Sequence, residues 1–263
     1  MSGPAAFADR ELGRTRLTVG PVGLSASYGI PAKAVEAAFE RGMNYLYFGS
    51  RRTGAFAEAV RNLRGRRERM VAVVQSYTPV AWYLERSVEA ALRKLGIEYA
   101  DVLLLGMWNR VPPARIFEAC ERLRESGKVR HIGMSAHHRP VFQQVAAGPP
   151  AVFHARYNAV HRGCETEVFP YLAAAGAGVV TYTATCWRRL LDQKRVPKGE
   201  PTPQAADCYR FALSQAAVQV CMTGTANEEQ TAHALTAVER GPMDEEELAW
   251  MRRVGDAIHA AGG

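Results

Sequence analysis

Hydrogen-bonding and aromatic side chains recur directly after short apolar runs of this sequence. The set contains several arginines and no carboxylate. Arginine binds carboxylates and phosphates through paired N–H donors, so we expect a site for an anionic or planar polar small molecule. The set consists of Ser25, Ser27, Tyr28, Tyr47, Ser50, Arg51, Arg52, Gln75, Ser76, Tyr77, Trp108, Asn109, Arg110, Ser135, His137, His138, His154, Arg156, Asn158, Thr183, Thr185 and Trp187.

Metal and thiol chemistry are not favoured by the pattern. His137 and His138 are adjacent, so their side chains diverge, and no third ligand is in view; we expect no metal site. The five cysteines form no CxxC pair, which is typical of a reducing compartment, and we expect a cytoplasmic protein. Cys186 follows an apolar run, but no paired base is identifiable from the sequence.

The elements that would position this set alternate along the chain. Each of eight short apolar runs is followed by a stretch of amphipathic or irregular sequence, and this alternation predicts parallel strand–helix units. Eight units in 263 residues predict a single (β/α)8 barrel, in which the ends of all strands meet at one mouth. The runs are 22–26, 45–48, 70–74, 102–105, 129–134, 152–157, 179–182 and 218–222.

Composition excludes other classes. The chain is 48% hydrophobic with a net charge of +7, and no basic run is interleaved with aromatic residues, so we expect no nucleic-acid partner. No apolar run approaches the roughly 18 residues of a membrane span, and we expect no membrane partner. No GxGxxG motif supports a Rossmann domain. A last helix is predicted over 244–259, with acidic residues in its first turn.

Four segments carry a family resemblance. They are 12–19 (LGRTRLTV), 42–46 (GMNYL), 91–102 (ALRKLGIEYADV) and 127–135 (GKVRHIGMS). Together, in order and spacing, they resemble the aldo/keto reductases over about residues 10–255. The resemblance implies one (β/α)8 barrel over residues 1–263 and reduction of carbonyl compounds with NADPH or NADH.

The resemblance also implies an Asp-Tyr-Lys-His tetrad, and this chain departs from it at every position. Tyr47 stands where the aspartate is expected and Arg52 where the tyrosine is expected. Gln75 replaces the lysine, and Gly106 replaces the histidine. Tyr47 therefore has two interpretations: a buried aromatic that fills the barrel, or a relocated acid.

The cofactor positions match in part. The resemblance implies that Ser135 contacts a nicotinamide amide, that Tyr182 stacks on the ring and that Thr183 follows it. Gly224 and Gln230 fall in a segment that resembles the family's phosphate-binding helix start. Glu228 and Glu229 oppose a 2′-phosphate there, which leaves NADP, NAD or no cofactor open.

We expect an oxidoreductase-derived enzyme with a remodelled active site that acts on a small polar or anionic molecule by non-standard chemistry. Tyr47 or Tyr77 would be the acid. The alternative is a non-catalytic pseudoenzyme that binds a ligand or a partner protein. The oligomeric state is not addressed by the sequence. The candidate catalytic residues are Tyr47, Arg52, Gln75, Tyr77, Trp108, Asn109 and His137.

Overall fold

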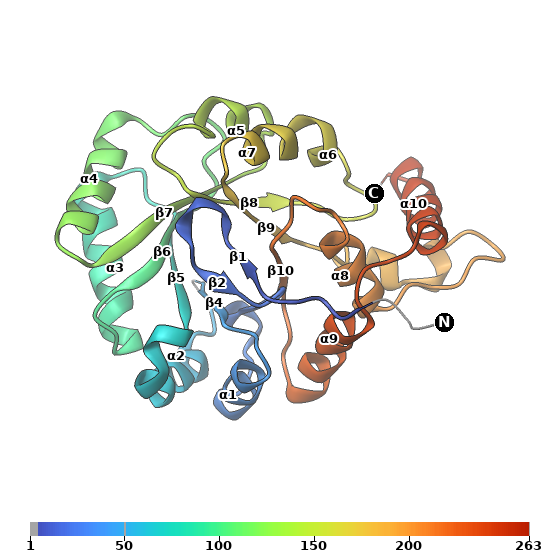
Figure 1. Cartoon of the computed structure of the whole chain (residues 1–263), viewed down its shortest axis with the longest axis horizontal. Coiled ribbons are helices and arrows are strands. Elements are labelled where there is room, and N and C mark those ends of the chain that lie inside the picture. Colours follow the sequence, from blue (N-terminus) through green and yellow to red (C-terminus); the bar gives the residue numbers. More distant parts are fainter. Residues whose placement is uncertain (1–4, 50, 263) are drawn as a thin grey trace.

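A closed barrel of eight parallel strands forms the centre of the molecule (Figure 1). The computed structural model describes residues 5–49 and 51–262. The strands pair in the order β10-β3-β4-β5-β6-β7-β8-β9, and each coincides with one predicted apolar run, so the predicted (β/α)8 barrel is confirmed. They are β3 (Val22–Ser25), β4 (Tyr45–Phe48), β5 (Val71–Ser76), β6 (Ala100–Leu105), β7 (Val129–Ala136), β8 (Val152–Arg156), β9 (Gly178–Tyr182) and β10 (Val220–Thr223).

Helices surround the barrel. Helix α3 ends at Gly96, whose φ of 67° needs the left-handed region that glycine adopts without strain. Helix α10 begins after Asp244, whose side chain accepts a hydrogen bond from the backbone of Glu247, as expected for a capped helix start. Among the described residues, no helix combines the length and apolar character of a membrane span. The helices are α1 (Ala32–Glu40), α2 (Gly54–Asn62), α3 (Ala81–Leu95), α4 (Ala114–Glu125), α5 (Pro140–Val145), α6 (Cys164–Glu167), α7 (Phe169–Ala174), α8 (Ala205–Leu213), α9 (Glu228–Arg240) and α10 (Glu245–Ala260).

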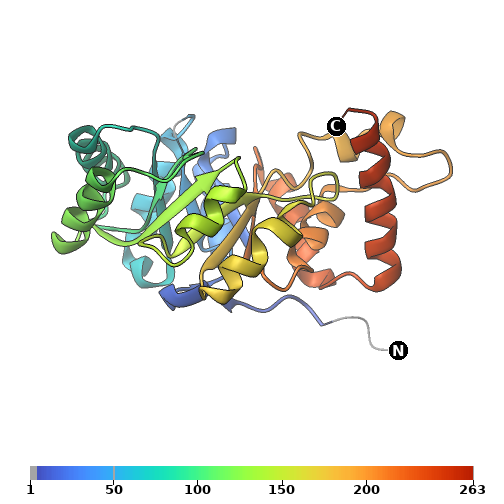
Figure 2. The ribbon, with the colours of Figure 1, turned by 90° about the horizontal axis from the view of Figure 1, so that it is seen from above.

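An N-terminal hairpin closes one end of the barrel (Figure 2). Its strands are β1 (Arg10–Glu11) and β2 (Thr18–Val19), and the side chain of Leu12 between them belongs to the apolar cluster inside the barrel. Leu12 contacts Gly178 at the start of β9 so closely that a Cβ on Gly178 would lie 2.7 Å from Leu12 Cγ. The amino ends of the strands are thus sealed, and the carboxyl ends remain as the open mouth.

Side chains alternate between the two faces of each strand. Tyr45, Val73 and Val102 belong to the inner cluster, whereas Leu46 and Val74 pack outward against the helices. Because the strand period is two, residues 47, 75, 135, 154 and 182 continue the inner face upward to the mouth. This alternation brings the predicted site residues of different strands together.

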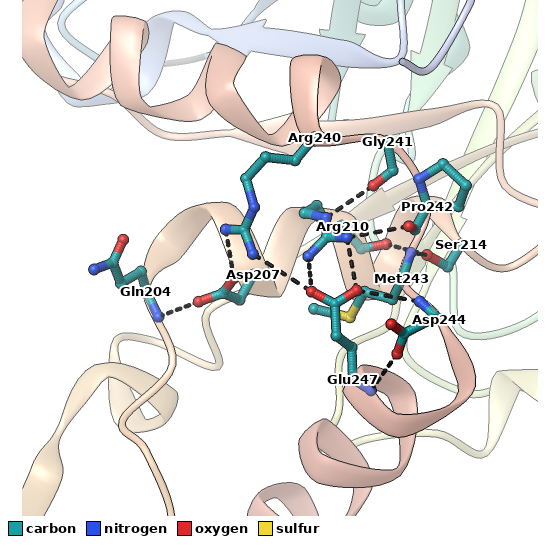
Figure 3. A network of polar contacts seen from close by, with 10 residues as sticks. All are labelled: Gln204, Asp207, Arg210, Ser214, Arg240, Gly241, Pro242, Met243, Asp244 and Glu247. Atoms are coloured by element: carbon teal, nitrogen blue, oxygen red, sulfur yellow. Dashed lines mark hydrogen bonds and ion pairs between the residues drawn. The ribbon is translucent and has the colours of Figure 1, made fainter. Parts of the chain in front are cut away.

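A buried arginine joins the last three helices (Figure 3). Arg210 on α8 is 2% exposed and donates to the carbonyls of Gly241 and Pro242 at 2.8 and 3.1 Å. Its guanidinium also makes a two-pronged ion pair with Glu247 on α10. The charge pair fixes the segment between α9 and α10 against α8, beside the wall of the mouth.

We predict that Glu247→Gln lowers the free energy of unfolding by about 2–3 kcal/mol, because it leaves the buried Arg210 without a carboxylate. Urea unfolding measures the change. Glu246→Gln is the matched control, since Glu246 is an exposed neighbour in the same helical turn and loses the same charge. Equal effects of the two substitutions would show that Arg210 does not depend on this partner.

Candidate active site

One cavity of about 1080 Å³ opens at the carboxyl ends of the strands. It extends from Tyr47 and Gln75 inside the barrel mouth to the first turn of α9. This size is at the upper end of the range of ligand sites. Eight of the twelve predicted catalytic and cofactor-binding residues line it: Tyr47, Gln75, Tyr77, Ser135, Tyr182, Thr183, Gly224 and Gln230. Six more members of the predicted mouth set do so as well: Ser25, Ser27, Tyr28, His154, Thr185 and Trp187.

The inner end of the cavity is lined by Tyr47, Gln75 and Tyr77, and Gly106 packs behind the last two. The Tyr47 hydroxyl donates a hydrogen bond to Gln75 Oε1. A Cβ at Gly106 would lie 2.4 Å from Gln75 Nε2 and 2.8 Å from the Tyr77 ring, so these side chains occupy the space that any larger residue at 106 would need. Burial, followed by the neighbouring Tyr77 hydroxyl, raises the pKa of Tyr47 well above 10. Tyr47 therefore keeps its proton at neutral pH.

A second buried pair lies beneath Tyr47. The Tyr45 hydroxyl is 2.7 Å from His154 Nε2, and both side chains are nearly inaccessible to solvent. Burial lowers the pKa of His154 from 6.5 to about 3, so the imidazole is neutral at physiological pH. Tyr45 otherwise lies among apolar side chains, so this hydrogen bond to His154 satisfies its buried hydroxyl.

Ser135 and Tyr182 line one wall of the cavity, as the resemblance implies. The Ser135 hydroxyl accepts a hydrogen bond from the backbone of Met107 at 3.0 Å, which leaves its own proton available to a ligand. Tyr182 is half-buried, and the His137 ring meets it edge to face with centroids 6.2 Å apart. Burial raises the pKa of Tyr182 to about 12, so its ring is neutral.

The far end of the cavity is the start of α9. Asn227 caps this helix by accepting from the backbone of Gln230 at 2.9 Å, and the Gln230 side chain accepts from the backbone of Ala226 at 2.9 Å. Glu229 and His233 line the same end. Between residues 222 and 234 the sequence has two glutamates and no lysine or arginine.

Four predicted catalytic residues do not line the cavity. Arg52 is exposed, because β4 ends at Phe48 and the chain turns outward at residue 52 with φ 50°. Trp108 is 7% exposed within the outer apolar cluster, because the chain reverses at Met107 with φ 60°. Asn109 and His137 act beside the cavity instead.

Asn109 holds the loop after β7. Its Oδ1 accepts from the backbone of His137 at 2.7 Å and of His138 at 3.0 Å. His137 in turn packs on the edge of Tyr182. Both residues therefore shape the wall without contacting the cavity, and Ser50 of the predicted mouth set lies outside the described residues.

Several lining residues escaped the sequence analysis. Met107 and Arg188 line the cavity because both occupy left-handed turns, with φ of 60° and 70°, which no local motif indicates. Tyr45 lies two residues before Tyr47 on the same strand, so both side chains point into the barrel. This spacing could have identified Tyr45 as the partner of the inward-facing His154. The structure also supplies the partner that the sequence lacked for Cys186: His161 Nδ1 lies 3.7 Å from its Sγ.

This thiol–imidazole pair is electrically neutral. Burial raises the pKa of Cys186, and burial together with neighbouring cations, first of all Arg156, lowers the pKa of His161 to about 4. The pair thus holds the loop after β9 and carries no thiolate. No group of three metal-ligating side chains occurs in the part of the chain that the structure describes.

The model of the aldo/keto reductase family matches residues 31–201, well over half of the chain. The chain belongs to the aldo/keto reductase family. The observed barrel and the order of the sequence motifs both agree with membership of this family of oxidoreductases.

Three curated reductases are similar to this chain at 29–30% sequence identity. Two aldo-keto reductases of Alternaria alternata, AFTS1 and AMT2, are 29% and 30% identical over 181 and 179 residues, which is 64% of this chain and 46% of each relative. The chain therefore spans about half the length of these curated relatives. An NADH-specific methylglyoxal reductase of Escherichia coli is 29% identical over 108 residues, covering 38% of this chain and 32% of the relative.

The barrel is also similar to solved structures of this family. An aldo-keto reductase of Bacillus halodurans superimposes with a TM-score of 0.78 in its holo form and 0.77 in its apo form. The match covers 94% of this chain and 95% of that one at 22% sequence identity, and it supports the fold.

The buried histidine predicts a pH-dependent stability. In the unfolded chain His154 binds a proton near pH 6.5, whereas in the folded protein it does so near pH 3. The unfolded state binds more protons between these values, so stability falls as the pH falls. We expect a loss of about 2 kcal/mol in the free energy of unfolding between about pH 6.5 and about pH 5.

Urea unfolding of the wild type and of His154→Gln across this range isolates the effect. Glutamine keeps an acceptor for Tyr45 and does not titrate, while His161 contributes equally to both proteins. Parallel pH profiles of the two proteins would contradict a neutral buried His154.

Proposed function

We propose that this protein binds a nicotinamide dinucleotide along its cavity and reduces a carbonyl compound with a proton donor specific to this chain. The observation that carries the proposal is the continuity of the cavity. Its inner end is lined by Tyr47, Ser135 and Tyr182, and its outer end by the first turn of α9. An elongated ligand with an aromatic head and phosphates in its middle matches this shape and chemistry.

The residues present fit such a group. Tyr182 offers an aromatic face, and Ser135 has a hydroxyl proton available to a carboxamide. Thr183 follows Tyr182 in the wall, and the backbone of the Gly224 segment lies at a helix start, which attracts phosphate. Arg188 lines the cavity between these ends and would neutralise phosphate charge.

The charges at the outer end favour NADH over NADPH. Glu229 lines the cavity next to Glu228, and both carboxylates would repel a 2′-phosphate. The Escherichia coli relative is named as NADH-specific, which agrees with this preference.

Tyr47 is the proton donor in this proposal. A bound nicotinamide supplies a hydride to a carbonyl carbon, and the oxygen then needs a proton. The raised pKa of Tyr47 restricts donation to a strong base, and an alkoxide forming on the substrate is such a base. Gln75 positions the hydroxyl, and the exposed Tyr77 connects it with solvent for reprotonation.

A non-catalytic ligand-binding role is the second candidate function. One observation favours it: the single proton of the Tyr47 hydroxyl already points at Gln75 Oε1. In that case the cavity would hold a dinucleotide without turnover.

We predict that calorimetric titration yields micromolar binding of NADH and weaker binding of NADPH. Tyr182→Leu should weaken NADH binding by about tenfold, because it removes the aromatic wall. Tyr171→Leu, at an exposed site on α7, is the matched control and should bind as the wild type does. Absence of binding at millimolar NADH would end the proposal.

Tyr47→Phe should lower kcat for reduction of an aldehyde by about a hundredfold or more while the Kd for NADH stays constant. In the wild type, kcat/KM should not decline up to about pH 10, because the donor does not titrate below that pH. Tyr83→Phe, on the exposed first turn of α3, controls for loss of a hydroxyl. If NADH binds but no aldehyde is reduced, the ligand-binding role replaces the reductase.

A further inference from the structure

Arg156 is the last residue of β8 and stands one step above His154 on the inner face of the barrel. Val152 belongs to the inner cluster and His154 lines the cavity, so strand alternation directs residue 156 toward the mouth. Arg156 itself lies at the rim, beside the cavity-lining residues Tyr182 and Trp187. In the ladder between β8 and β9, Arg156 is the register partner of Tyr182. It therefore stands beside the wall that the proposed cofactor would use.

The guanidinium of Arg156 lacks a partner of opposite charge among the described residues. Arg139, which acts with Arg156 on the pKa of His161, is paired with Glu167 at 2.9 Å. No hydrogen bond or ion pair of the Arg156 side chain occurs within residues 5–49 and 51–262. A half-buried cation on the inner face of a barrel is costly unless an anion joins it.

One aromatic ring lies beside this cation. Its Cζ lies 5.7 Å from the centroid of the Trp187 ring, and Trp187 is 58% exposed at the edge of the cavity. Burial is the largest cause of the lowered pKa of His137 and His161, and the positive charge of Arg156 is the second cause for both. The electrostatic field of Arg156 therefore reaches both histidines on this side of the mouth. A ligand here meets the charge of Arg156 beside the Trp187 ring, while Arg188 in the cavity wall would neutralise the phosphates of the proposed cofactor.

We propose that Arg156 binds the carboxylate of the substrate, so that the protein acts on carbonyl compounds that carry one carboxylate on a planar or apolar body. A carboxylate matches the paired donors of one guanidinium. The start of α9 and Arg188 already serve the phosphates of the proposed cofactor, which leaves Arg156 for a carboxylate. The inference rests on the proposed function for the role of the ligand as substrate, but the anion site can be tested without cofactor.

The test compares the binding of benzoate and of its neutral analogue benzamide to the full chain. Calorimetry measures the affinity, and the fluorescence of Trp187 reports occupation of the site. The wild type should bind benzoate about tenfold more tightly than benzamide, and Arg156→Gln should abolish that preference. Arg139→Gln, which removes an equal charge nearby, should retain it. Arg156→Lys keeps the charge without paired donors and should bind benzoate about threefold more weakly than the wild type.

Equal affinities for benzoate and benzamide in the wild type would overturn the carboxylate site, whatever the behaviour of the variants. Tighter binding of phenyl phosphate than of benzoate would overturn the choice of carboxylate. Failure of NADH to bind while benzoate still requires Arg156 would refute the proposed function and leave the anion site standing. If NADH binds, Arg156→Gln should lower kcat/KM for 4-carboxybenzaldehyde relative to its methyl ester about tenfold.

Discussion

The hydroxyl of Tyr45 lies in the apolar interior of the barrel, and the ring nitrogen of His154 at 2.7 Å is its partner. A buried hydroxyl without a partner costs about 1–3 kcal/mol, so the two residues constrain each other. The pair also marks the floor of the site along the barrel axis. Tyr47 and Gln75 lie directly above it toward the mouth, and Arg156 follows His154 along β8. Below it, the hairpin closes the barrel with Leu12 and Val19.

The two ends of the barrel therefore have different chemistry for a physical reason. At the sealed end, aliphatic side chains fill the interior without polar groups. At the open end, the inward-facing positions of the same strands carry hydroxyls, an amide and a guanidinium. The Arg210–Glu247 pair holds the segment between α9 and α10 against α8. The helix that forms the outer end of the cavity is therefore anchored by a charge pair outside the cavity.

The sequence predicted the features that follow from periodicity. Strand alternation and motif order located the eight strands and grouped Tyr47, Gln75, Ser135 and Tyr182 at one mouth. Two of the misplaced residues, Arg52 and Trp108, lie where the chain leaves a strand through a left-handed turn. At Met107 such a turn exchanges the expected positions of Met107 and Trp108, and near Arg188 it places an arginine in the wall. These turns use non-glycine residues, so no composition signal marks them.

Gly106 has a consequence for how Tyr47 is held at the mouth. Its missing side chain leaves room for Gln75 and Tyr77, and a Cβ there would lie within 2.8 Å of both. Both contacts are with the outer ends of side chains, Gln75 Nε2 and the ring of the exposed Tyr77, so a larger residue at 106 would be accommodated by displacing these two. Displacing Gln75 would remove the acceptor of the Tyr47 hydroxyl, so a position with no side chain of its own controls how the proposed proton donor is held.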